Sequence, residues 1–299
     1  MIGRLWNSAS LRQGSSVLFR SCSSKASAPA AASDEPLYRE IYQNNQVVRL
    51  VLNNPKKRNV LTMKVMDTLL MELKGINGIE KVRAVIIASE GNAFSAGHDL
   101  KELKVEESSG HAQKELFAKC TELMSQIQRM DVPVIAEVDG VAAAAGCQLV
   151  ASCDIAIASE KASFSVPGLK AGIFCSTPSI PLARNIPRKM AMDMLLTARP
   201  INAQEALAVG LVSRVVPQEE LRFESLKIAE SICTMSRSVT SLGKAFFYTQ
   251  VELPQNQAYR FGEAVMVENA KLVDCQNGIN AFIEKHSPEW THSNEKVGK

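Results

Sequence analysis

The sequence of 299 residues predicts an α/β protein, because short apolar runs alternate with segments of helical periodicity. Hydrophobic residues make up 46% of the chain, enough for one large domain with a smaller appendage, or for two domains. From about residue 230 the pattern is mostly helical. We therefore expect an α/β core followed by a C-terminal helical region.

The strands of the core are predicted by five short apolar runs. They are Val47–Leu52, Ala84–Ala88, Val134–Val138, Asp154–Ala158 and Leu211–Val216. Taken alone, strands that alternate with helices favour a doubly wound sheet.

Two helices between these strands carry recognisable end signals. Thr62 is a good N-cap, and Gly75 is expected to end the helix that follows it. Asn202 and Glu205 have the spacing of a capping box, and Gly210 supplies the stop. A further helix is predicted by apolar residues that step by four and three positions, namely Leu116, Cys120, Leu123, Ile127 and Met130.

The charge of the chain is concentrated at its N-terminus. The formal net charge is +3, whereas residues 1–33 hold four basic residues and no acid, so the remainder carries −1. This Ser-, Ala- and Arg-rich segment predicts a mitochondrial transit peptide that is removed after import. A body near neutrality does not favour nucleic-acid binding, and no apolar run approaches the roughly 20 residues of a membrane span.

Cysteine and histidine are scattered along the chain. The seven Cys include no CxxC pair, and the four His show no metal-ligand spacing. Buried thiols in a reducing compartment fit this pattern better than a disulfide framework does, and we expect no metal and no cofactor.

Three motifs in order carry a family resemblance. They are NAFSAGHDLKEL at 92–103, DGVAAAAGCQLVASCDIAIAS at 139–159 and PINAQEALAVGLVSRVV at 200–216. Together they resemble the crotonase, or enoyl-CoA hydratase/isomerase, superfamily over roughly residues 38–290. The resemblance implies a spiral of ββα turns at 36–229, a helical trimerisation domain at 230–292 and a tail at 293–299. It also implies an acyl-CoA ligand and a homotrimer or hexamer.

The resemblance assigns an oxyanion hole to two backbone N–H groups, those of His98 and Ala145. Donors aimed at a developing enolate oxygen contribute about 10²–10³ in rate each. The side chain of His98 could in addition serve as a general acid or base.

The hydratases of this superfamily use two glutamates, whose positions align with Gln148 and Gly168. Neither residue exchanges a proton near pH 7, so we expect little or no hydratase activity. Restoring both acids should raise hydration, unless Gly168 has a positive φ. Gln148 could instead satisfy a buried partner, and Cys175 could act as a nucleophile only if a neighbour lowered its pKa.

The resemblance places CoA contacts on basic and aromatic residues. Lys57 and Arg58, beside Lys56, belong to a segment that cradles adenine in relatives, and Lys101 can reach a phosphate. Phe282 and Lys285 match positions that reach the ligand of a neighbouring subunit.

Several functions remain open at this level. The expectation is an acyl-CoA-binding protein of fatty-acid metabolism in the mitochondrial matrix. One alternative is a decarboxylase-type lyase, in which the substrate's own carboxylate leaves, although that branch has Tyr where this chain has Cys175. A residual hydratase or isomerase is another. RNA binding is disfavoured, because Lys and Glu are mixed along the helices.

Overall fold

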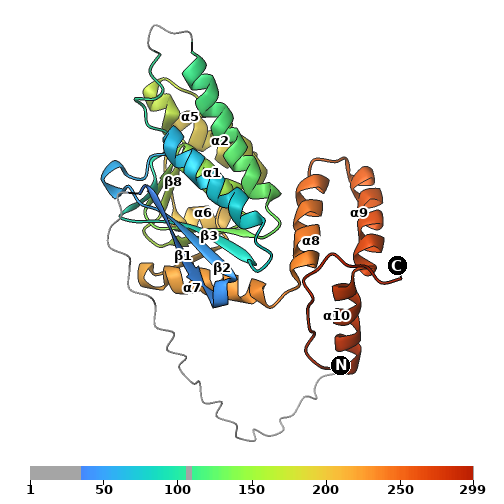
Figure 1. The fold of residues 1–299 in the computed structure, drawn as a ribbon. Coiled ribbons are helices and arrows are strands. Elements are labelled where there is room, and N and C mark those ends of the chain that lie inside the picture. The colour runs from blue at the N-terminus through green and yellow to red at the C-terminus, as the bar shows by residue number, and fades with distance from the viewer. Residues whose placement is uncertain (1–34, 106–109, 299) are drawn as a thin grey trace, which may run out of the picture. The chain divides into compact units, whose positions relative to one another are not determined.

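The computed structural model describes residues 35–105 and 110–298, so the predicted transit peptide lies outside the described residues. The core is built from repeated strand–strand–helix turns (Figure 1). The first is β3 (Ala84–Ser89), β4 (Ala93–Ser95) and α2 (His111–Arg129). The second is β5 (Val134–Val138), β6 (Val141–Ala143) and α3 (Ala145–Ser152). The third is β7 (Ile155–Ser159), β8 (Ser163–Ser165), η3 (Pro167–Ala171) and α4 (Ser176–Asn185).

Each turn gives one strand to each of two sheets. The larger sheet has the order β1-β2-β3-β5-β7-β10, where only β1 (Leu37–Tyr42) and β2 (Val47–Leu52) pair antiparallel. The smaller sheet has the order β4-β6-β8-β9, with β9 at Ile201–Asn202. Two sheets fed alternately by successive turns form the expected crotonase-like spiral, not the doubly wound sheet that periodicity alone suggested.

The larger sheet is covered on both faces. On β3, Val85 and Ile87 belong to the main core with α1 (Met63–Asn77) and α2. The alternate residues Ala84 and Ile86 pack in a smaller cluster with α7 (Leu221–Cys233). Helix α7 lies on the opposite side of this sheet from α1 and α2 (Figure 1). A strand buried on both faces reads as a continuous apolar run, which is why β2, β3 and β5 were predicted well.

The observed ends of α6 and α1 can be compared with the capping residues predicted from the sequence. The capping box of Asn202 and Glu205 is formed, and Gly210 ends α6 (Ala203–Val209) in the left-handed conformation. The end predicted at Gly75 is wrong, because α1 continues to Asn77. Ile76 is fully buried, so the apolar face of the helix gains from one further turn.

The last predicted strand is shorter than expected. β10 covers Arg214–Val216, whereas Leu211 and Val212 lie in the turn after α6 and are buried in the main core. Their apolar character therefore reflects burial in a turn and not strand pairing. The remaining short helices are η1 (Gln43–Asn45), η2 (Pro55–Lys57), α5 (Arg188–Thr197) and η4 (Gln218–Glu220).

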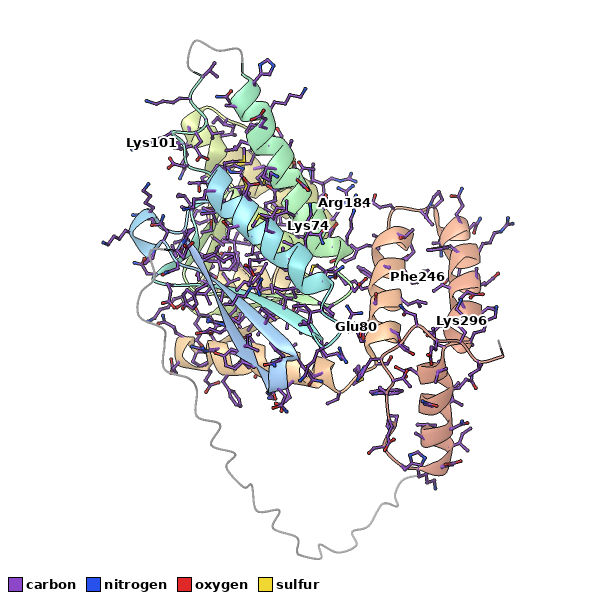
Figure 2. The ribbon with its side chains drawn as sticks, viewed as in Figure 1. Lys74, Glu80, Lys101, Arg184, Phe246 and Lys296 are labelled. Atoms are coloured by element: carbon purple, nitrogen blue, oxygen red, sulfur yellow. The ribbon has the colours of Figure 1, made fainter. Side chains whose placement is uncertain are left out.

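The C-terminal region is helical, as predicted. It consists of α8 (Arg237–Gln250), α9 (Gln255–Ala270) and α10 (Val273–Glu284). Phe246 of α8 packs on Phe261 of α9, with ring centroids 5.5 Å apart (Figure 2). The division expected at residue 229/230 falls inside α7, which packs on the larger sheet.

None of the helices described at 35–105 and 110–298 is both long enough and apolar enough for a membrane span.

A buried lysine joins α8 to the core. The Nζ of Lys244 donates to Oδ2 of Asp154 at 2.7 Å and to the carbonyl oxygen of Ile127 at 2.9 Å. Tyr248 donates its hydroxyl to the other oxygen of Asp154 at 2.8 Å. Ile127 lies in the last turn of α2, and Asp154 lies between α3 and β7, so these contacts tie the first C-terminal helix to two separate parts of the core.

Candidate functional site

Two loops meet at the end of the smaller sheet. Strands β4 and β6 pair in parallel, with Ser95 opposite Ala142, so the segments that follow them are neighbours. A Cβ added at Gly97 would lie 3.0 Å from the amide nitrogen of Ala145, and one added at Gly146 would lie 2.3 Å from the carbonyl oxygen of Ser95. The two backbones therefore approach as closely as glycine allows.

This approach brings together the two amides predicted as oxyanion donors. The His98 amide follows Gly97, which has φ +88°, and Ala145 is the first residue of α3. Among the described residues neither amide donates a hydrogen bond to a backbone or side-chain acceptor. Free N–H groups at a helix start, next to a second free N–H, suit a partly negative oxygen.

The residue before α3 holds an unusual conformation. Ala144 has φ 49° and ψ −118°, a region that residues with a Cβ rarely adopt. Its carbonyl oxygen accepts the Gln148 amide at 3.0 Å, and its amide donates to Ser165 at 2.9 Å. The strained residue therefore sets the direction in which α3 begins.

The imidazole of His98 is held beside the same loop. Its Nδ1 lies 3.2 Å from the carbonyl oxygen of Leu61, so Nδ1 carries the proton and Nε2 is the unprotonated nitrogen. The ring packs edge-on against Phe117 of α2, with centroids 5.8 Å apart. Burial lowers the pKa of His98, although the Leu61 carbonyl and the Glu102 carboxylate oppose that effect. Nε2 is buried and has no partner among the described residues.

Gln148 lies one turn into α3 and is only 4% exposed. Its Oε1 accepts a hydrogen bond from the thiol of Cys120 on α2, at 3.8 Å. Burial raises the pKa of Cys120 to about 12, so this thiol remains a donor near neutral pH. The position expected for the first family acid therefore holds a neutral amide, which accepts from a buried thiol.

Gly168, at the position expected for the second family acid, has no room for a side chain. Its amide donates to Sγ of Cys175 at 3.2 Å. An added Cβ would lie 2.3 Å from the carbonyl oxygen of Ile173 and 2.7 Å from that sulfur. Gly168 is not among the positive-φ residues, so the obstacle to an acid here is steric and not the backbone strain considered from the sequence.

Cys175 does not show the environment of a nucleophile. Burial raises the pKa of its thiol, and the N–H of Gly168 opposes that effect only in part. The thiol is therefore protonated at neutral pH, and it occupies the space beside Gly168.

Three of the residues expected to contact CoA lie in or near segments that adjoin the loop at 95–98. Lys57 ends η2, and Arg58 follows in the left-handed conformation at φ 53°. The carbonyl oxygen of Arg58 accepts the amide of Ala96 at 2.9 Å, which joins this segment to the loop before His98. Lys101 is exposed just beyond that loop (Figure 2).

The two C-terminal candidates lie elsewhere in the fold. Phe282 is on α10 and is 85% exposed, and Lys285 caps that helix at φ 60°. No described hydrogen bond or ion pair joins either side chain to residues 54–61 or 95–98. Within one copy of the chain, therefore, no described contact joins them to the loop at 95–98.

Comparison with known proteins agrees with this geometry. A family model described as enoyl-CoA hydratase/isomerase matches residues 42–293. The chain belongs to the enoyl-CoA hydratase/isomerase family. Among relatives in this family, the mitochondrial enoyl-CoA hydratase domain-containing protein 3 of Mus musculus is 45% identical over 271 residues, covering 91% of this chain and 90% of the relative.

Solved structures of the family show the same fold. The crystal structure of human enoyl-CoA hydratase domain-containing protein 3 has a TM-score of 0.82 and 47% identity, covering 86% of this chain and 100% of that one. An enoyl-CoA hydratase of Mycobacterium smegmatis has a TM-score of 0.83 and 41% identity, covering 86% and 99%.

Sequence reasoning missed three residues around the site. Leu61 holds Nδ1 of His98, Phe117 packs on its ring, and Cys120 contacts Gln148. Cys120 was recognised only as part of an apolar helix face. Its four-residue step from Leu116 is a signal of burial, and nothing in that spacing shows which polar group the thiol meets.

Proposed function

We propose that this chain is a mitochondrial acyl-CoA-binding protein of fatty-acid and acyl-CoA metabolism that retains an oxyanion hole but has lost hydratase proton chemistry. The thioester oxygen of the ligand accepts hydrogen bonds from the amides of His98 and Ala145. Lys57, Arg58 and Lys101 contact the CoA portion. The similar mouse and human proteins are named as mitochondrial, which supports import, and we assign this chain to the matrix.

One observation carries the proposal, namely the close approach of the Gly97 and Ala145 backbones. A Cβ added at Gly97 would lie only 3.0 Å from the Ala145 nitrogen, so the two loops can come this close only because residue 97 has no side chain. Both amides lack a described acceptor. An N–H group that is buried without an acceptor costs about 1–3 kcal/mol, and a bound thioester oxygen would supply an acceptor for both amides.

The loss of hydration follows from the two acid positions. Gln148 is an amide held by a thiol, and the space at Gly168 is filled by Ile173 and Cys175. Each general acid or base contributes about 10²–10⁴ in rate, so an enzyme without both retains little of the hydratase rate.

The shared role of Phe282 and Lys285 requires a homotrimer or hexamer. The exposed Phe282 side chain would then be covered by a neighbouring copy and would reach its ligand.

Import can be tested with a tagged full-length chain, which should reach mitochondria and lose residues near its basic N-terminus. A chain that stays cytosolic and unprocessed would contradict the proposed location.

The oxyanion hole can be tested with a matched pair of ligands. Butyryl-CoA has a thioester carbonyl, and the S-butyl thioether of CoA lacks it while keeping the same chain. Calorimetry should show tighter binding of butyryl-CoA, and the infrared band of its carbonyl should move to lower frequency when bound. Absence of butyryl-CoA binding, or an unshifted carbonyl band, would overturn the proposal.

The proton chemistry needs a separate assay. Crotonyl-CoA should bind but be hydrated at a small fraction of the median enzyme turnover of about 10 s⁻¹. A turnover at or above that median would show that the acids lie elsewhere in the chain.

A further inference from the structure

The side-chain amide of Asn59 joins three backbone segments in the interior of the protein, where Asn59 is only 2% exposed. Its Oδ1 accepts the backbone amide of Asn54 at 2.7 Å. Its Nδ2 donates to the carbonyl oxygen of Glu90 at 2.9 Å and to that of Ala93 at 2.7 Å. An amide offers an acceptor oxygen and two donor hydrogens, and Asn59 uses all three in these contacts.

The backbone at this position also favours asparagine. Arg58 and Asn59 both lie in the left-handed region, at φ 53° and φ 50°. Asparagine adopts this region more readily than most residues that carry a Cβ. The backbone amide of Asn59 donates to the carbonyl oxygen of Asn54 at 2.9 Å. The main chain and the side chain of Asn59 therefore close the turn at 54–59, which carries Lys57 and Arg58.

This turn holds both ends of β4. Asn59 binds the carbonyl oxygen of Ala93, the first residue of the strand. The carbonyl oxygen of Arg58 accepts the amide of Ala96, which follows its last residue, at 2.9 Å. The pairing of β4 with β6 is irregular between Ala93 and Ser95, so the sheet alone does not set the path of the chain here. The turn therefore fixes where the loop at 95–98 begins.

Leu61, just beyond Asn59, fixes the direction of the His98 amide. The N–H of Leu61 donates to the carbonyl oxygen of Gly97 at 2.8 Å. That carbonyl and the N–H of His98 belong to one planar trans peptide unit, in which the two groups point in opposite directions. Because the carbonyl is held toward Leu61, the N–H is aimed away from Leu61, and the hydrogen bond also polarises the peptide.

We propose that Asn59 is a positioning residue for the oxyanion hole, because it fixes the segment 58–61 that orients the His98 amide. The turn that it closes carries Lys57 and Arg58, the proposed contacts of the CoA portion. Asn59 therefore sets the distance between the nucleotide end of the ligand and the thioester oxygen. The inference rests on the proposed acyl-CoA function and adds a residue that acts only through the backbone.

The test uses Asn59→Asp, which keeps the size of the side chain and the acceptor for Asn54 but replaces the donor nitrogen with an oxygen. In the folded variant, the infrared carbonyl band of bound butyryl-CoA should lie closer to that of the free ligand than it does in the wild type. The ratio of affinities for butyryl-CoA and S-butyrylpantetheine, which lacks the nucleotide, should fall about tenfold, the order expected for one lost hydrogen bond.

Asn53→Asp is the matched control. The Nδ2 of Asn53 donates to the carbonyl oxygen of Glu35 at 3.2 Å, which lies outside the turn at 54–59 and the loop at 95–98. The control should keep the wild-type band and the wild-type ratio. If Asn59→Asp does not fold, Asn59→Gly replaces it, because glycine adopts a φ of 50° without strain and removes the side-chain bonds.

The readouts separate positioning from stability alone. A residue that only stabilises the fold would lower the free energy of unfolding when it is replaced, without moving the band of the bound carbonyl. A wild-type band or a wild-type ratio in the folded Asn59 variant would therefore overturn the inference. Failure of butyryl-CoA to bind the wild type, or an unshifted band in the wild type, would instead contradict the proposed function.

Discussion

The amide of Gly168 donates a hydrogen bond to the thiol of Cys175, with 3.2 Å between nitrogen and sulfur. The pair is packed so tightly that a Cβ at residue 168 would also meet the carbonyl oxygen of Ile173 at 2.3 Å. Only glycine therefore fits at residue 168 without a shift of the neighbouring atoms. An acid cannot be restored here by one substitution.

Gly168→Ala should therefore lower the free energy of unfolding by about 1–3 kcal/mol, the usual cost of overpacking. Gly75→Ala is the matched control, because Gly75 lies inside α1 and an added Cβ meets nothing within 4 Å. The control should raise the free energy of unfolding by about 0.5–1 kcal/mol through helix propensity. Urea unfolding measures both, and equal effects would refute the steric account.

Ala144→Gly should raise the free energy of unfolding, in contrast to Gly168→Ala. The observed φ of 49° and ψ of −118° strain an alanine by about 1–3 kcal/mol, whereas a glycine loses about 0.5–1 kcal/mol in chain entropy. We expect a net gain in stability of about 1 kcal/mol, with butyryl-CoA affinity unchanged because the backbone amides remain. Ala143→Gly, whose residue is not at positive φ, should destabilise and serves as the control. A loss of stability in Ala144→Gly would argue against strain at this residue.

The His98 imidazole should titrate below its ordinary pKa of 6.5, because burial disfavours the charged form. The folded state then binds fewer protons than the unfolded state, so stability falls as pH drops from about 6.5 toward the folded pKa. His98→Gln should reduce this pH dependence.

His286 provides an internal contrast for this titration. The Ser287 carbonyl and the Glu284 carboxylate raise its pKa above 6.5. Its contribution to stability is present below 6.5 and is lost as pH rises through the folded pKa. Imidazole NMR should resolve His98 as the lower of the two, with its proton on Nδ1. The reverse order would contradict the effect of burial on His98, and a proton on Nε2 would contradict the assigned tautomer.

Assembly should depend on the exposed residues of the C-terminal helices. Light scattering of the processed protein should show about three or six copies. Phe282→Glu should reduce assembly without unfolding the chain, because Phe282 is 85% exposed in one copy. Glu284→Gln, also on the exposed side of α10, is the control. A stable monomer that binds acyl-CoA with full affinity would exclude a shared site at Phe282 and Lys285.

Local signals in the sequence were sufficient for much of the fold. The strands at 47–52 and 134–138 were predicted with the observed bounds, and the Asn202 capping box is formed. Such elements are visible because burial on both faces or a cap leaves a pattern within a few residues. The short strands β4, β6 and β8 span three residues each and were not predicted as a second sheet, because a run that short has no readable period.

At the candidate site, the sequence by itself determined that residues 148 and 168 are not acidic and that the loop before Gln148 is built from small residues. The tertiary structure alone decided what those residues meet. Cys175 and Ile173 fill the space at Gly168 because the chain folds back within a few residues, and Cys120 donates to the amide of Gln148 from another helix. Packing of this kind depends on differences of a few tenths of an ångström in the distances between atoms. Residue types and their spacing in the sequence do not encode such differences.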